Sequence, residues 1–254
     1  MTDGTLAARI AAAELDWIVP AWPVPANVGA LSTTRNLGPG REIDFSTRNP
    51  HLAKARSELR RFVPREPLWL AQVHGCAIAS ADTPATRPPP ADGAVARDAD
   101  NACAVLTGDC LPVLYASRDG SVVAAAHAGW RGLLAGVLEA ALLAMRVDPK
   151  AVLVWLGPAI GPAAFEVGND VYDAFMAHDR ATQVCFRAMR AGKWRADLYA
   201  LARHRLARAG VDAVYGGGRC TFTERDSFYS YRRGGTDASR RMASIIWRTE
   251  CRAS

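Results

Sequence analysis

Two short apolar runs within residues 104–137 constrain the fold of this chain more than any other stretch. Residues 111–116 and 122–126 are rich in Val, Leu and Ala and are bounded by Gly, Asp and Ser, a pattern typical of buried strands. Residues 133–145 follow closely, and their Leu and Ala content predicts a helix. The stretch therefore predicts a β-hairpin followed by a helix.

Each predicted strand of this unit adjoins a side chain that can take part in chemistry. Cys110 comes immediately before the first run, and His127 comes immediately after the second. The sequence GWRG, which contains Arg131, then opens the predicted helix, and a helix start beside an arginine favours an anion. The unit is expected to hold a thiol, an imidazole and an anion-binding group together, and a metal-free Cys110–His127 dyad is one interpretation.

Composition limits the classes of protein that this chain can belong to. Half of the 254 residues are hydrophobic, which excludes a disordered chain. The net charge of +6 comes mostly from dispersed arginines without an aromatic-interleaved basic tract, so we expect a mild preference for anions and no nucleic-acid partner. The six cysteines form no CxxC pair, and neither a signal sequence nor a membrane-spanning run is recognisable. We therefore expect a cytoplasmic protein with no membrane partner, whose cysteines are free thiols or metal ligands.

The rest of the chain alternates between predicted strands and helices. We expect strands at 28–33, 68–75, 152–156, 211–215 and 242–247, and helices at 51–62, 170–178 and 197–209. Residues 76–80 are expected to pair antiparallel with 68–75, and the polar loop 37–50 is a candidate mobile lid. Without a repeat or a clear boundary, this alternation predicts an α/β (α+β) fold in a single domain, 1–254, with residues 1–20 as a peripheral N-terminal tail.

Two histidines and a cysteine at predicted strand ends form a sufficient ligand set for a catalytic zinc with one open position: His74, Cys110 and His127. Because they are far apart in sequence, their spacing is equally compatible with two buried core histidines and an unreactive cysteine that bind no metal. Three arginines follow turns or strand ends and suit phosphate or carboxylate, or a structural role: Arg35, Arg131 and Arg232. Three carboxylates could act as an acid, as a base or as partners that orient a metal ligand: Asp92, Asp109 and Glu166. Each of them could equally have a structural role in a turn or a helix cap.

Many motifs, in order along the chain, resemble those of the YfiH-type family, also described as laccase-domain or multicopper polyphenol oxidase-like proteins. The matching pieces are Thr34-Arg35, QVHG at 72–75, ADGAV at 91–95, TGDCLPVL at 107–114, AAHAGWRGL at 125–133, GPAIGP at 157–162, FEVGNDV at 165–171 and a tail that contains CTFTERDSFYSYRR at 220–233 and RMASIIW at 241–247. The segment RNLGPGREIDFSTRNP that begins at Arg35 departs from the usual family pattern, as do residues 233–237.

The resemblance implies zinc on His74, Cys110 and His127 and a fold similar to cysteine-hydrolase-like or toxin deamidase proteins. It implies purine nucleoside phosphorylase activity on adenosine, inosine or guanosine with phosphate, together with adenosine deaminase activity, and we expect a monomer. The site residues expected to take part in catalysis are Cys110, His127, Asp92 and Arg131. The residues expected to bind substrate are Arg35, Gln72, Arg232 and Tyr231, with Phe228 as an alternative to Tyr231 for stacking on the base.

Four alternatives remain open at the level of sequence. Copper fits the same His₂Cys set, as a polyphenol oxidase would require, although a multicopper cluster needs more histidines than three. Some relatives resemble amidases that edit cytoplasmic muropeptide precursors. Cys110 is also a candidate metal-free nucleophile. A non-catalytic metal site would need a fourth protein ligand, for which Cys76 and Asp92 are candidates.

Overall fold

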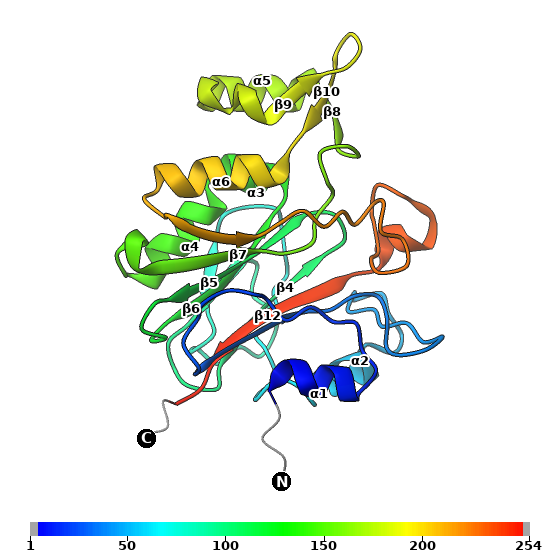
Figure 1. The fold of residues 1–254 in the computed structure, drawn as a ribbon, viewed down its shortest axis with the longest axis vertical. Helices are drawn as coiled ribbons and strands as arrows, with labels where there is room; N and C mark the ends of the chain where they lie inside the picture. Colours follow the sequence, from blue (N-terminus) through cyan, green and yellow to red (C-terminus); the bar gives the residue numbers. More distant parts are fainter. Residues whose placement is uncertain (1–4, 251–254) are drawn as a thin grey trace.

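Two β-sheets packed face to face form the centre of this computed structural model, which describes residues 5–250 (Figure 1). The smaller sheet is antiparallel and has the order β1 (Val28–Ser32), β12 (Met242–Arg248), β4 (Ala102–Thr107). The larger sheet is mixed and has the order β11 (Ala213–Gly216), β7 (Val152–Leu156), β5 (Leu111–Ser117), β6 (Val123–Ala128), β3 (Gly93–Ala96), β2 (Ile78–Ser80). Its central pair, β5 and β6, is the predicted hairpin.

Helices cover the outer face of each sheet. The smaller sheet packs against α1 (Leu6–Ala12) and α2 (Leu52–Leu59), and the larger against α3 (Trp130–Ala135), α4 (Val137–Met145) and α6 (Leu198–Arg208). A third sheet of order β8 (Glu166–Gly168), β10 (Lys193–Ala196), β9 (Phe186–Ala188) lies with α5 (Asn169–His178) at the top of Figure 1. Short 3-10 helices span Pro149–Ala151, Arg180–Cys185 and Gly235–Ser239.

The hairpin strands are apolar on both faces because both faces are covered. Val113 and Tyr115 of β5 point into the helix-covered core, whereas Leu114 and Ala116 point toward the smaller sheet. All four side chains are fully buried. This two-sided burial explains why residues 111–116 and 122–126 read as continuous apolar runs rather than as alternating ones.

The predicted α/β class is confirmed by these layers, whereas the specific likeness to toxin deamidases stays a prediction. The strands predicted at 28–33, 111–116, 122–126, 152–156, 211–215 and 242–247 are present to within about two residues, as are the helices at 170–178 and 197–209. The helix predicted at 51–62 is shorter, because it ends at Leu59. Within residues 5–250, no helix combines the length and apolar character needed to cross a bilayer.

The strand predicted at 68–75 is wrong. The segment is extended, but its only bridge joins Leu68 to Cys103, and three of its last backbone N–H groups donate to the Asp92 carboxylate instead of to a strand. The antiparallel partner predicted at 76–80 is wrong as well, because β2 pairs in parallel with β3. A carboxylate from elsewhere in the chain has replaced the hydrogen bonds of a ladder, which sequence periodicity does not reveal.

The single helix predicted at 133–145 is divided at Gly136, which has a φ of +93° and separates α3 from α4. L-residues with side chains rarely adopt this left-handed backbone conformation, whereas glycine does so freely. The break lets α3 begin directly after β6, next to the predicted site, while α4 turns to cover the sheet.

The expected N-terminal tail, where it is described, and the expected lid both contribute buried side chains to the body of the protein. Ile10 and Trp17 are buried beside α2 in the outer core, and residues 1–4 of the expected tail lie outside the described residues. In the loop 37–50, Ile43 and Phe45 are buried, and Asp44 accepts hydrogen bonds from the backbone N–H groups of Ser46 and Arg241. These contacts anchor the centre of the expected lid.

We expect Gly136→Ala to lower the free energy of unfolding by about 1–2 kcal/mol, because alanine pays the left-handed backbone penalty. Space is not the cause, since the nearest heavy atoms would lie 3.7 Å from an added Cβ. The matched control is Gly136→Asn, which should lose less stability because asparagine tolerates this conformation. Urea unfolding of both variants measures the difference, and equal losses would contradict the backbone explanation.

Candidate metal centre

The three predicted ligands meet at one end of the larger sheet. Cys110 immediately precedes β5, and His127 lies near the end of β6, where it pairs in register with Pro112. His74 reaches the same place from the extended segment before β2. One ligand atom from each side chain lies within 4.8 Å of the other two, so residues that are far apart in sequence form one cluster.

A buried carboxylate positions both histidines of the cluster. Asp92 Oδ1 accepts from the backbone N–H of His74 at 2.9 Å and lies 2.9 Å from Nδ1 of His127. Asp92 Oδ2 accepts from the backbone N–H groups of Gly75 at 2.7 Å and Val73 at 3.2 Å. These bonds hold His74 at a φ of +62° and leave the Nε2 atom of His127 free to face the cluster. The arrangement is the one that fixes the tautomer and orientation of metal-binding histidines.

A glycine makes room for the cluster on its third side. A Cβ at Gly129 would lie 2.9 Å from Cys110 Sγ and 3.4 Å from Cδ2 of His74. The first distance is closer than real Cβ contacts allow, so a side chain at this position would displace the thiol. The glycine that follows β6 is therefore required by the close approach of two ligands, in addition to any role at the start of α3.

The groups of the cluster alter one another's ionisation. Burial disfavours the Cys110 thiolate, but the charge of His127 and the hydrogen bonds from His127 and His74 outweigh this and lower the pKa of Cys110 to about 6. Burial disfavours the charged form of His127 as well, but Cys110 and Asp92 raise its pKa to about 9. The pKa of Asp92 is lowered despite its burial, because His127 and backbone N–H groups bond to its carboxylate. The thiolate form that binds metals is thus available near neutral pH.

Two imidazoles and a thiolate are a donor set that suits a transition metal such as zinc or copper. The group of mutually close ligand atoms contains His74, Cys110 and His127 and, among the described residues, neither Cys76 nor Asp92. Asp92 is instead engaged with His127 and the backbone. Three protein ligands are typical of a catalytic metal site, in which a fourth position faces the substrate.

The cluster lies at the surface of a cavity of about 820 Å³. Four arginines line this cavity: Arg48, Arg131, Arg232 and Arg241. Three aromatic side chains line it as well: Trp130, Phe165 and Tyr231. Among the described lining residues the only carboxylate is Asp109, and it accepts from Thr221 Oγ1, Ser230 Oγ and the backbone N–H of Arg232. The cavity is therefore positively charged and has flat apolar surfaces.

Three of the predicted substrate and anion contacts line this cavity in an accessible form. The guanidinium of exposed Arg131 stacks over the Trp130 ring at 4.3 Å, and Tyr231 is 67% exposed. Arg232 donates from Nη1 to the Glu166 carbonyl at 2.8 Å. Glu166 itself contributes this backbone carbonyl, and its side chain is not among those that line the cavity.

Other predicted residues have structural partners instead. Gln72 lines the cavity, but its amide donates to the Leu106 carbonyl at 2.8 Å and accepts from the Leu106 N–H at 2.7 Å, so it joins its segment to β4. Arg35 is not among the lining residues, since its guanidinium pairs with Glu42 and stacks on Tyr229. Phe228 is fully buried and does not line the cavity either. We therefore place neither Arg35 nor Phe228 against a substrate.

Four of the arginine and aromatic residues that line the cavity were not predicted as site residues. Arg48 lies in the loop that departs from the family pattern, and Arg241 is the first residue of the family motif RMASIIW, the rest of which lies in β12. Trp130 was noted only as part of GWRG, and Phe165 only as part of FEVGNDV. The signal that was available for Trp130 was its position between His127 and Arg131, both of which were predicted to belong to the site.

Comparison with known proteins identifies the same family as the sequence motifs. A family model described as "multi-copper polyphenol oxidoreductase laccase" matches residues 43–249. The chain belongs to this family, which includes the YfiH proteins. It is 45% identical over 240 residues to a protein of Escherichia coli named purine nucleoside phosphorylase YfiH, an alignment that covers 91% of this chain and 98% of the relative. A Pseudomonas aeruginosa protein named purine nucleoside phosphorylase PA4543 is 45% identical over 242 residues, and this alignment covers 91% of this chain and 98% of that protein.

Solved structures of the family share the fold. The crystal structure of Neisseria meningitidis protein NMB0706 superposes with a TM-score of 0.88 at 44% identity, covering 92% of this chain and all of that one. YlmD from Geobacillus stearothermophilus superposes with a TM-score of 0.81 at 27% identity, covering 92% and 96% of the two chains. The layers described above are therefore those of family members whose structures have been solved.

We expect Asp92→Asn to weaken zinc binding by about 10–100-fold, because the orientation of His127 and the position of His74 both depend on this carboxylate. Competition with a chromogenic chelator measures the affinity, and thermal unfolding monitors the fold. Asp148→Asn is the matched control, because Asp148 also accepts from a backbone N–H, that of Lys150, but lies outside the cluster. Unchanged affinity in Asp92→Asn would contradict the positioning role.

In protein stripped of metal, we expect alkylation of Cys110 by iodoacetamide to follow an apparent pKa of about 6. The thiolate is the reactive form, so the rate should be low at pH 5, rise through pH 6 and level off by about pH 8. An ordinary thiol would continue to gain reactivity up to about pH 9. Mass spectrometry of the Cys110 peptide measures the rate, with Cys110→Ser as the blank. A rate that still rises above pH 8 would contradict the effect of His127.

Proposed function

We propose that this protein is a zinc-dependent purine nucleoside phosphorylase that cleaves adenosine, inosine and guanosine with inorganic phosphate. The observation that carries the proposal is a cluster of three side chains that could hold a metal, at the surface of a cavity that combines four arginines with three aromatic side chains. This combination suits a substrate pair of an anion and a planar base. The names of the relatives from Escherichia coli and Pseudomonas aeruginosa support the same activity.

Phosphate is assigned to the arginine side of the cavity. Arg131 and Arg48 line it and are exposed, and neither forms an ion pair with a carboxylate among residues 5–250. Arg232 is held by the Glu166 carbonyl and thereby presents a fixed donor group at the same wall. Guanidinium groups bind phosphate oxygens through paired N–H donors, which orients the anion as well as attracting it.

The nucleoside is assigned to the aromatic side, with the purine against Tyr231 or Trp130. In the proposed reaction a phosphate oxygen forms a bond to C1′ of the ribose while the bond from C1′ to the purine nitrogen breaks. The electron pair of that bond leaves with the purine, which takes up a proton, and ribose 1-phosphate remains. A zinc ion on His74, Cys110 and His127 would act as a Lewis acid that polarises a substrate oxygen. Deamination of adenosine is included as a second reaction of this site.

The other activities have less support from the cavity. A multicopper oxidase needs several copper sites, but the cluster uses two of the five histidines and, among the described residues, leaves the others outside it. His204, for example, lies 2.8 Å from Asp179. An amidase acting on muropeptide precursors would use the same three ligands, and it stays a prediction. A non-catalytic site would need the fourth protein ligand that neither Cys76 nor Asp92 provides among the described residues.

We expect purified protein loaded with zinc to convert inosine and phosphate into hypoxanthine and ribose 1-phosphate. Cys110→Ser should lower kcat/KM by at least about a hundredfold, because it removes a metal ligand. Cys76→Ser is the matched control, since Cys76 is exposed and lies outside the cluster, and it should retain activity. Chromatography of the products measures both, and an absence of ribose 1-phosphate with all three nucleosides would refute the proposal.

A further inference from the structure

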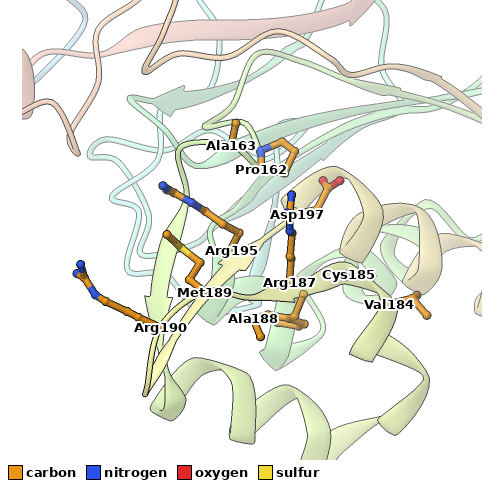
Figure 2. A pocket seen from close by; sticks show the side chains of 11 residues that line it. Pro162, Ala163, Val184, Cys185, Arg187, Ala188, Met189, Arg190, Arg195 and Asp197 are labelled. Carbon is orange, nitrogen blue, oxygen red and sulfur yellow. The ribbon is translucent and has the colours of Figure 1, made fainter.

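A second cavity, with a volume of about 810 Å³, lies between the β9–β10 hairpin and the loop that contains Pro162 and Ala163 (Figure 2). No residue lines both this cavity and the one beside the metal cluster. Three arginines of the hairpin region line it: Arg187, Arg190 and Arg195. The motifs discussed above do not include any of these side chains.

Two of these arginines are direct neighbours across the hairpin. Arg187 of β9 and Arg195 of β10 are register partners in the antiparallel pair, so their side chains leave the sheet on the same face. In Figure 2 the Arg187 side chain extends toward the Pro162–Ala163 loop, and the Arg195 side chain extends from the neighbouring strand to the upper left of the view. The opposite face of the hairpin is apolar, and there Trp194 stacks on Tyr172 of α5. The sheet thus separates an apolar face from a cationic one.

Like charges at directly opposed positions destabilise an antiparallel pair. Within residues 5–250, neither Arg187 nor Arg195 forms an ion pair with a carboxylate. Glu166 is the register partner of Arg195 on β8, but its carboxylate pairs with Arg190 at 3.3 Å. Asp197 accepts from the backbone N–H of Ala200 at 3.0 Å, as the N-cap of α6. Two guanidinium groups are therefore left facing one space without a partner.

The remaining wall of the cavity is apolar. Val184 is 86% exposed and Met189 is 45% exposed, and both line the space together with Pro162. The volume falls within the range of small-molecule sites, roughly 300–1,000 Å³, and exceeds what one phosphate ion would fill.

We propose that this cavity binds a nucleoside diphosphate or a closely similar phosphorylated small molecule. Its phosphate groups would lie between Arg187 and Arg195, where a diphosphate offers oxygens to both guanidinium forks. Its apolar part would lie against Met189 and Pro162. The binding site is separate from the metal centre, so it does not depend on the function proposed above.

Isothermal titration calorimetry of the 254-residue protein with ADP tests the proposal, with inorganic pyrophosphate and adenosine as further probes. ADP should bind more tightly than pyrophosphate, and adenosine should not bind at this site. Arg187→Gln and Arg195→Gln should each raise the Kd for ADP by about tenfold or more, since each removes charge-assisted hydrogen bonds. Arg87→Gln is the matched control, because Arg87 is exposed and lines neither cavity, and its Kd should be unchanged.

A variant in the other cavity distinguishes the two sites. If Arg131→Gln weakens ADP binding and Arg195→Gln does not, the anion occupies the metal-centre cavity and the proposal is wrong. An absence of ADP binding overturns it as well, whether or not the protein has phosphorylase activity. Without ligand, Arg187→Gln should melt no lower than the wild type, because it relieves repulsion. With ADP, the wild type and Arg87→Gln should gain more melting temperature than Arg187→Gln, and an equal gain in Arg187→Gln would contradict the assignment.

Discussion

The carboxylate of Asp92 is the interaction on which the metal centre depends. It is buried at the start of β3, where an isolated charge would be strongly disfavoured, and it is stabilised by three backbone N–H groups and the His127 imidazole. Those same bonds hold the 73–75 segment in place of a strand ladder and set the orientation of two ligands. The same buried carboxylate therefore accepts hydrogen bonds from backbone N–H groups that have no strand partner and orients the two histidines of the site.

The metal-ligand residues and the arginines of the cavity are carried by different kinds of element. The thiol and one imidazole are attached to β5 and β6, whose residues are buried on both faces between the smaller sheet and the helices. The arginines come from loops and from the first turn of α3. Precise ligand geometry is thus placed on the least mobile elements, and substrate contacts on segments that can differ in sequence without disturbing the sheets. The atypical loop that supplies Arg48 is an instance of such variation.

The parts of the structure that sequence predicted well are those set by local pattern. Continuous apolar runs located β5 and β6, and the positions of Cys110 and His127 at their ends followed directly. The strand expected to carry His74 is absent, so the family motif QVHG was the better indication that His74 belongs with Cys110 and His127. The partners of Gln72 and Arg35, Leu106 and Glu42, could not be predicted, because only tertiary packing brings these residues together. Arg241 opens the family motif RMASIIW, but its place in the cavity could not be predicted, because only the folded chain brings the start of β12 there.

The convergence of ligands from three separate segments has a consequence for the life of the protein. An unfolded chain cannot bring His74, Cys110 and His127 within reach of one ion, so a metal that binds them favours the native state by mass action. Metal supply would then govern how much of this protein survives proteolysis in the cell, in addition to how much of it is active.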